Sequence, residues 1–241
     1  MKTLLILGSK PEPELPPPTS FQEVACANAS GYSAERHDLS RPAFTVMTPI
    51  MATNIEAGRQ SLEALTGLST GTVYFLRQRN EGKRGFARLL HLIKMSRKKP
   101  VHRVQPFYLK RKLRSISYRH DRMVALGPEK YDTLVERLCD RDAEVLSQLE
   151  RKRPSTGVIA LALAIDQKRY DRYILSGFNF ELTHPYAINP VIERRGTAAS
   201  SHAETDVMVI RYLARKTGTV FTTERAVHER AAVPFLPGLI R

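Results

Sequence analysis

The strongest constraint on the fold is a series of short apolar runs, most of which stop abruptly at glycine, proline, asparagine or serine. These runs occupy residues 3–7, 23–27, 44–48, 72–76, 173–176 and 220–223. Between them lie segments with apolar residues at helical spacing, at 55–65, 131–149, 157–165 and 205–216. Strands that alternate with helices form a mostly parallel sheet with helices on both faces. We therefore expect an α/β fold whose ligand binds beyond the carboxyl ends of the strands.

Basic charge is concentrated in one part of the 241-residue chain. Sixteen of the 38 lysines and arginines, but only two of the 24 acidic residues, lie between Arg77 and Arg122, so the remainder is neutral. The length suits one domain over residues 1–241. We expect the segment 77–122 to be a basic helical insertion or lid within that domain.

In the basic segment two aromatic residues, Phe107 and Tyr108, are interleaved with lysines and arginines. Such a surface attracts polyanions, whether an acidic glycan, an anionic membrane or single-stranded nucleic acid. We expect a lid or acceptor platform that also rests on an anionic membrane surface, with a solvated insertion as the alternative. A nucleic-acid-binding α/β protein is the alternative from another class; it explains the charge but not the motifs described below.

The two cysteines, Cys26 and Cys139, have no partners at metal-ligand spacing. Zinc and a disulfide framework are therefore not expected, and a reducing cytoplasm suits this composition. Residues 1–7 resemble the start of a signal peptide, but the apolar run stops at Gly8. We expect a cytoplasmic protein, at most peripheral at the inner membrane face.

The segment Arg153-Pro154-Ser155-Thr156-Gly157 precedes an apolar helix. Ser155 is typical of an N-cap, and Gly157 lets a ligand approach the backbone closely. A phosphate suits the positive end of the helix, with Arg153 as a further cation. A simple N-cap without a ligand is the alternative.

Two histidines follow in similar surroundings. Ser176-Gly177-Phe178-Asn179-Phe180 ends a strand and is followed by His184-Pro185-Tyr186, while His202 opens a later helix. A histidine in such a place is a candidate general base near neutral pH. A solvated or capping histidine is the alternative for each of them.

Taken together, these motifs resemble the sialyltransferases of bacterial family 42 and, more loosely, those of family 29. The matching segments near the carboxyl terminus are 153–165, 173–180, 186–187 and 202–213. Gly8-Ser9-Lys10-Pro11, Cys26-Ala27-Asn28 and Thr48-Pro49 match the first half at lower specificity. The resemblance covers residues 3–60 and 150–237, and the basic middle is not covered.

The resemblance implies a Rossmann-like domain of the GT-A-variant kind and inverting transfer of a sialic acid, Kdo or related ulosonic acid. The donor substrate would be its CMP-sugar and the acceptor a glycan or glycolipid hydroxyl, with no metal and no cofactor. His202 would be the general base, and Tyr186 with His184 would stabilise the departing phosphate. The donor end would be held by Arg153, Ser155, Thr156 and Gly157, in a pocket with Gly8, Ser9, Asn28 and Phe178.

The chain departs from the family 42 pattern in two places. Phe180-Glu181 stands where that family has a second tyrosine, and His184 is the expected substitute. Lys10 stands where the first turn of the family has a second glycine. A noncatalytic relative that binds CMP-sugars is therefore a further alternative. Asp140-Arg141-Asp142 mimics the metal motif of other glycosyltransferases, but we expect it to be a solvated face of the helix at 131–149.

Overall fold

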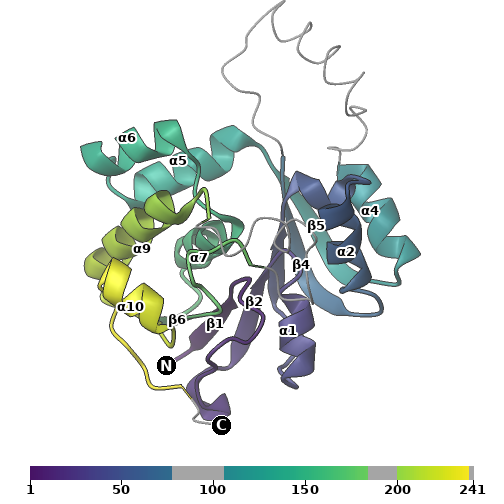
Figure 1. The fold of residues 1–241 in the computed structure, drawn as a ribbon, viewed down its shortest axis with the longest axis horizontal. Coiled ribbons are helices and arrows are strands. Elements are labelled where there is room, and N and C mark those ends of the chain that lie inside the picture. The colour runs from purple at the N-terminus through teal and green to yellow at the C-terminus, as the bar shows by residue number, and fades with distance from the viewer. Residues whose placement is uncertain (78–105, 184–199, 239–241) are drawn as a thin grey trace, which may run out of the picture.

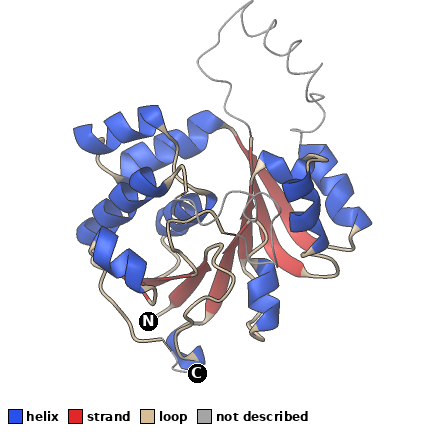
Figure 2. Cartoon of the chain, viewed as in Figure 1, coloured by secondary structure: helices blue, strands red, loops and turns tan. Residues whose placement is uncertain are grey.

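The computed structural model describes residues 1–77, 106–183 and 200–238. Its centre is a seven-stranded sheet with the order β5-β4-β3-β2-β1-β6-β7, and every neighbouring pair is parallel (Figures 1 and 2). The strands are β1 (Thr3–Leu7), β2 (Glu23–Ala27), β3 (Phe44–Met47), β4 (Ser69–Leu76), β5 (Arg119–Leu126), β6 (Arg172–Ser176) and β7 (Val220–Thr222). The predicted α/β fold class is confirmed.

Helices cover both faces of the sheet (Figure 1). One face carries α5 (Pro128–Leu138), α6 (Ala143–Arg151), α7 (Thr156–Gln167), α9 (Ala203–Thr217) and α10 (Arg225–Ala231). The other carries α1 (Gly31–Arg36), α2 (Glu56–Glu63) and α4 (Pro106–Ser115), and short 3-10 turns occur at η1 (Pro18–Ser20) and η2 (Pro49–Ala52). None of the helices in these described ranges is long and apolar enough to cross a bilayer.

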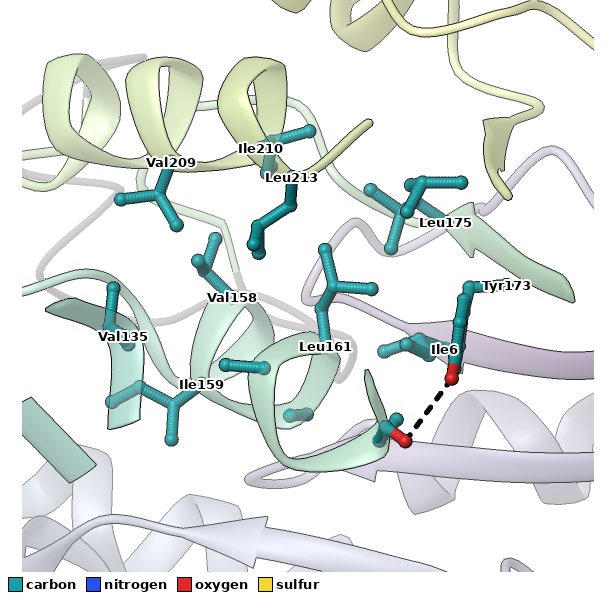
Figure 3. Packing of buried hydrophobic residues seen from close by; sticks show 14 of the residues in the cluster. Ile6, Val135, Val158, Ile159, Leu161, Tyr173, Leu175, Val209, Ile210 and Leu213 are labelled. Atoms are coloured by element: carbon teal, nitrogen blue, oxygen red, sulfur yellow. Dashed lines mark hydrogen bonds between the residues drawn. The ribbon is translucent and has the colours of Figure 1, made fainter. Parts of the chain in front are cut away.

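Helix α7 is the central helix of the larger hydrophobic core. It is buried from Thr156 to Ala164 because the sheet, α5 and α9 surround it, and its sequence is accordingly apolar on all sides. Figure 3 shows Val158 and Leu161 among side chains from the sheet and from α9, while Ile159 lies beside Val135 of α5. A helix enclosed in this way holds its amino-terminal end in a fixed place.

Part of the predicted basic insertion belongs to the fold itself. Helix α4 buries Leu109 and Leu113 in a second, smaller core cluster that also contains Met47, Met51 and Phe75. β5 pairs with β4 to form one edge of the sheet. Residues 78–105 lie outside the described residues. The role of 77–122 as a lid therefore stays a prediction.

The single helix expected over 131–149 is wrong. Helix α5 ends at Leu138, and Asp140 and Arg141 both adopt left-handed backbone conformations that break the helical path. Asp142 then caps α6 by accepting hydrogen bonds from two backbone amides, each at 3.1 Å. The Asp140-Arg141-Asp142 sequence is thus a turn between two helices and not a helix face.

Candidate functional site

The carboxyl ends of four strands meet around one cavity of about 460 Å³. Gly8, Asn28, Thr48 and Gly177 directly follow β1, β2, β3 and β6, and all four line it. The strand order reverses between β1 and β6, which is where a parallel α/β sheet leaves a crevice. The cavity is lined by nine predicted site residues: Gly8, Ser9, Asn28, Arg153, Ser155, Thr156, Gly157, Phe178 and His202.

The turns after β1 and β6 are packed directly against each other. The Gly8 amide donates to the Ser176 carbonyl at 2.8 Å, and the Lys10 amide donates to the Gly177 carbonyl at 2.9 Å. A Cβ atom on Gly8 would lie 2.3 Å from the Gly177 oxygen, so no other residue fits there. Gly177 itself has a φ of +74°, which also favours glycine. Both glycines are therefore required by the floor of the cavity.

The buried carboxylate of Glu224 bonds to both of these turns. Glu224 is 2% exposed and accepts hydrogen bonds from the amides of Gly177 at 2.7 Å and Glu14 at 2.9 Å. Its other oxygen pairs with Lys10 Nζ at 2.6 Å. Buried carboxylates need such partners to offset lost hydration. Glu224 could not be predicted as a buried residue, since nothing in the neighbouring sequence indicates its burial.

Asn28 connects two strand ends to helix α7. Its side-chain oxygen accepts from the backbone amide of Thr48 at 3.0 Å and from the Thr48 hydroxyl at 3.2 Å. Its amide nitrogen donates to Thr156 Oγ1 at 3.2 Å. Because that oxygen already accepts, the Thr156 hydroxyl has its proton to donate elsewhere. Asn28 has a φ of +52°, a conformation that asparagine tolerates better than most residues.

The start of α7 offers backbone donors to an anion. Ser155 caps the helix with its side chain toward the Val158 amide, as predicted, and its own amide donates to Asp206 at 2.7 Å. Both polar groups of Ser155 are therefore engaged within the protein. The amides of Thr156 and Gly157 belong to the first turn, which has no intrahelical acceptors for them. An anion is thus expected to bind these two amides and the Thr156 hydroxyl.

Gly157 and Arg153 also lie at the amino-terminal end of α7 and line the cavity. A Cβ on Gly157 would lie 2.7 Å from the Phe178 ring, so the ring packs directly on the helix backbone. Arg153 Nη1 lies 3.5 Å from the Tyr131 hydroxyl, and Arg153 forms no ion pair with any carboxylate in the described part of the chain. A cation without a paired carboxylate beside a helix amino terminus favours a negatively charged ligand.

His202 is held in one tautomer. Its Nδ1 lies 2.8 Å from the Arg153 carbonyl, which can only accept, so Nδ1 carries the proton and Nε2 has a free lone pair. Burial lowers the pKa of His202 below the ordinary 6.5; the Arg153 carbonyl opposes this shift, while the charges of Lys152 and Arg153 add to it. The ring is therefore neutral near pH 7 and able to take a proton.

Two predicted catalytic residues, His184 and Tyr186, lie outside the described residues. The loop that leads to them begins with Phe180, at a φ of +58°, and with Glu181, whose amide donates to the Asn179 side chain at 3.2 Å. Glu181 is exposed and lines the cavity. Within residues 1–77, 106–183 and 200–238, no group of three or more histidines, cysteines and acids is arranged to hold a metal ion.

Neither a protein-family model nor a curated protein sequence matches this chain, but solved structures do. The sialyltransferase CstII from Campylobacter jejuni, with the substrate analogue CMP-3FNeuAc, matches 99% of this chain and 88% of its own, with a TM-score of 0.55 and 15% identity. The α-2,3-sialyltransferase Cst-I from the same organism matches 100% and 83%, at 0.53 and 12%. This chain has their fold.

A third structure, CST-II in complex with a trisaccharide acceptor and CMP, matches 99% of this chain and 87% of its own, at a TM-score of 0.54 and 14% identity. At such identities the likeness establishes the sialyltransferase fold over nearly the whole chain. The motifs that carried the sequence resemblance at 153–157 and 202–206 border one cavity within this fold. The roles of individual residues remain proposals.

Proposed function

We propose that this chain is an inverting glycosyltransferase that moves a sialic acid, Kdo or related ulosonic acid from its CMP-sugar to a glycan hydroxyl. One observation carries the proposal. His202 and the amino-terminal end of α7 border the same cavity. The carbonyl of Arg153, just before α7, bonds to Nδ1 of His202 and so connects the two. A base and a phosphate site in one cavity are what transfer from a sugar phosphate requires.

In the proposed reaction each of these groups has one role. His202 Nε2 takes the proton of the acceptor hydroxyl while its oxygen attacks the anomeric carbon from the face opposite the phosphate. The bond between the anomeric carbon and the phosphate oxygen breaks, and CMP leaves with the electron pair. Arg153 and the amides of Thr156 and Gly157 stabilise the charge that develops on the phosphate. These donors act without a metal ion.

Further hydrogen-bond donors to the departing phosphate come from the segment after β6. The resemblance gives this role to Tyr186 with His184, in place of the tyrosine that Phe180-Glu181 lacks. Four residues line the cavity beyond β1, β2 and β6 and would surround the nucleoside part of the donor, namely Gly8, Ser9, Asn28 and Phe178. One similar structure holds the substrate analogue CMP-3FNeuAc and another holds a trisaccharide acceptor with CMP, which supports a CMP-sugar donor and a glycan acceptor for this chain.

A nucleotide panel tests the donor site first. CMP at 100 times its dissociation constant should stabilise the protein by about 2.7 kcal/mol, which a thermal unfolding assay detects easily. UMP, GMP and AMP should stabilise it less at the same concentrations. If CMP gives no more stabilisation than GMP, the donor assignment is wrong.

Transfer from CMP-sialic acid and from CMP-Kdo then tests the chemistry. His202→Ala should abolish transfer and leave CMP binding nearly unchanged, because the base acts on the acceptor. His228 provides a matched control, since its Nδ1 bonds to the Val233 carbonyl at the same 2.8 Å but it does not line the cavity. His228→Ala should keep transfer. If CMP binds the wild type but no sugar is transferred, the chain is the noncatalytic relative.

We propose that the basic segment faces an anionic membrane that presents a glycolipid acceptor. In its described part, Phe107 is 57% exposed on α4, next to the exposed cations Lys110, Arg111 and Arg114. An aromatic side chain among cations is typical of surfaces that bind anionic lipids. Flotation with phosphatidylglycerol vesicles at low salt should recover the protein, and phosphatidylcholine vesicles should not. Absence of binding to both would refute the proposal.

A further inference from the structure

A buried carboxyl group beside the cavity has no part in the reaction proposed above. Asp206 is 5% exposed, and its Oδ1 accepts from the Ser155 amide at 2.7 Å; the Ser155 hydroxyl bonds to it as well. Asp206 also lies one helical turn after His202, whose carbonyl accepts from the Asp206 amide at 2.8 Å. The side chain therefore links the first turn of α9 to the cap of α7.

Two further bonds join the same elements. His202 Nδ1 bonds to the Arg153 carbonyl at 2.8 Å, and Thr205 Oγ1 donates to the Lys152 carbonyl at 3.2 Å. Three side chains from the start of α9 thus hold three backbone groups of residues 152–155. This number of bonds fixes both the distance and the orientation between the two segments.

The protonation of Asp206 suits a place beside an anion site. Burial raises the pKa of Asp206 to about 7, against the bonds from Ser155, which lower it. No described lysine or arginine forms an ion pair with it. With a pKa of about 7, about half of these carboxyl groups are neutral at pH 7, and the neutral form accepts the Ser155 amide without repelling a phosphate bound at the same helix end.

We propose that Asp206 is the positioning residue that sets the phosphate-binding end of α7 and the base His202 at a fixed separation. This inference rests on the proposed function, because the two ends matter only if they serve one reaction. Asp206 acts through Ser155 and His202 and need not touch the substrate. Ser155 consequently serves as the cap that Asp206 holds, and Thr156 and Gly157 provide the phosphate donors.

The test compares Asp206→Leu, Asp206→Asn and Thr205→Val with the wild type. Asp206→Leu leaves the Ser155 amide without an acceptor, and a displacement near 1 Å at the reacting groups lowers kcat by about 100-fold. It should also raise the dissociation constant of CMP by about tenfold, more than His202→Ala, which removes the bond to the Arg153 carbonyl but leaves the cap of α7 in place. Asp206→Asn keeps a neutral acceptor at the same place and should restore both values to within about threefold. Thr205→Val should have the smallest effect.

A spectroscopic measurement separates positioning from simple destabilisation. In ¹⁵N spectra of labelled histidine, His202 should be the Nδ1–H tautomer in the wild type and in Asp206→Asn, and a mixture of tautomers in Asp206→Leu. If Asp206→Leu does not fold, Asp206→Ala replaces it, because a water can then occupy the site. Melting temperatures confirm that each variant is folded during the measurements.

The outcomes distinguish the two proposals. If the wild type neither binds CMP nor transfers sugar, the proposed function fails and the catalytic role of Asp206 fails with it. If the wild type is active but Asp206→Leu keeps the wild-type kcat, CMP affinity and His202 tautomer, the positioning role alone is refuted. Loss of kcat and CMP affinity in Asp206→Leu with recovery in Asp206→Asn supports both.

Discussion

The contact between the turns after β1 and β6 makes a quantitative prediction for Gly8→Ala. The added Cβ would lie 2.3 Å from the Gly177 oxygen, whereas ordinary contacts begin near 3.4 Å, so the turns must separate by about 1 Å. That movement breaks the bonds from the Gly8 and Lys10 amides to Ser176 and Gly177. Two buried backbone hydrogen bonds and the overpacking together cost about 2–4 kcal/mol.

Thermal unfolding measures this cost. For a chain of this size the melting temperature should fall by about 4–15 °C, and the CMP affinity should fall with it because the turn lines the cavity. Gly31→Ala is the matched control, since its Cβ would lie 3.3 Å from the tip of the Leu65 side chain, which can move. The control should melt within about 3 °C of the wild type. A Gly8→Ala protein with wild-type melting and CMP affinity would refute the steric argument.

Three further predictions concern buried charges and protons. The pH profile of kcat/KM for the acceptor should rise to a plateau with a midpoint below 6.5, because burial lowers the pKa of His202; a midpoint above 7 would contradict this. Burial raises the pKa of Asp206 from 3.8 to about 7, so the folded state holds a proton that the unfolded state loses between these values. The free energy of unfolding should therefore decrease by up to about 4 kcal/mol from pH 4 to pH 7. Urea titrations at several pH values measure this decrease, and the part caused by Asp206 should be absent in Asp206→Asn. Glu224→Leu leaves the amides of Gly177 and Glu14 without an acceptor and leaves Lys10 with Glu14 as its carboxylate partner, so the free energy of unfolding in urea should fall by about 3–5 kcal/mol. Glu224→Gln still accepts from both amides and should lower it less.

The fold was predictable because its central strands are fully buried. β1, β2, β3 and β6 are covered on both faces, so their sequences are continuous apolar runs that end at the edge of the core. β5 was missed because it is an edge strand with exposed arginines, and its composition resembles that of a solvated segment. The break between α5 and α6 was missed because apolar spacing alone does not reveal the left-handed residues at 140–141.

The candidate site could be predicted in part for a similar reason. Gly8, Asn28 and Gly157 stand at the ends of recognisable elements, where a parallel sheet gathers its ligand-binding residues. Partners that act through tertiary contacts carry no such local signal. Glu224 has no marker in the sequence, and only folding brings it to the amide of Gly177. Asp206 stands in the motif at 202–206, but its bond to the amide of Ser155 is visible only in the folded chain.

The strand order also has a consequence for how the chain folds. β1 is the middle partner of β2 and β6, yet β2 follows it closely in the sequence while β6 begins only at Arg172. During synthesis one side of β1 therefore exposes unpaired amides and carbonyls until most of the protein has left the ribosome. Because Gly8 and Gly177 meet at that late junction, the cavity that they line cannot form in a nascent chain that stops before residue 172.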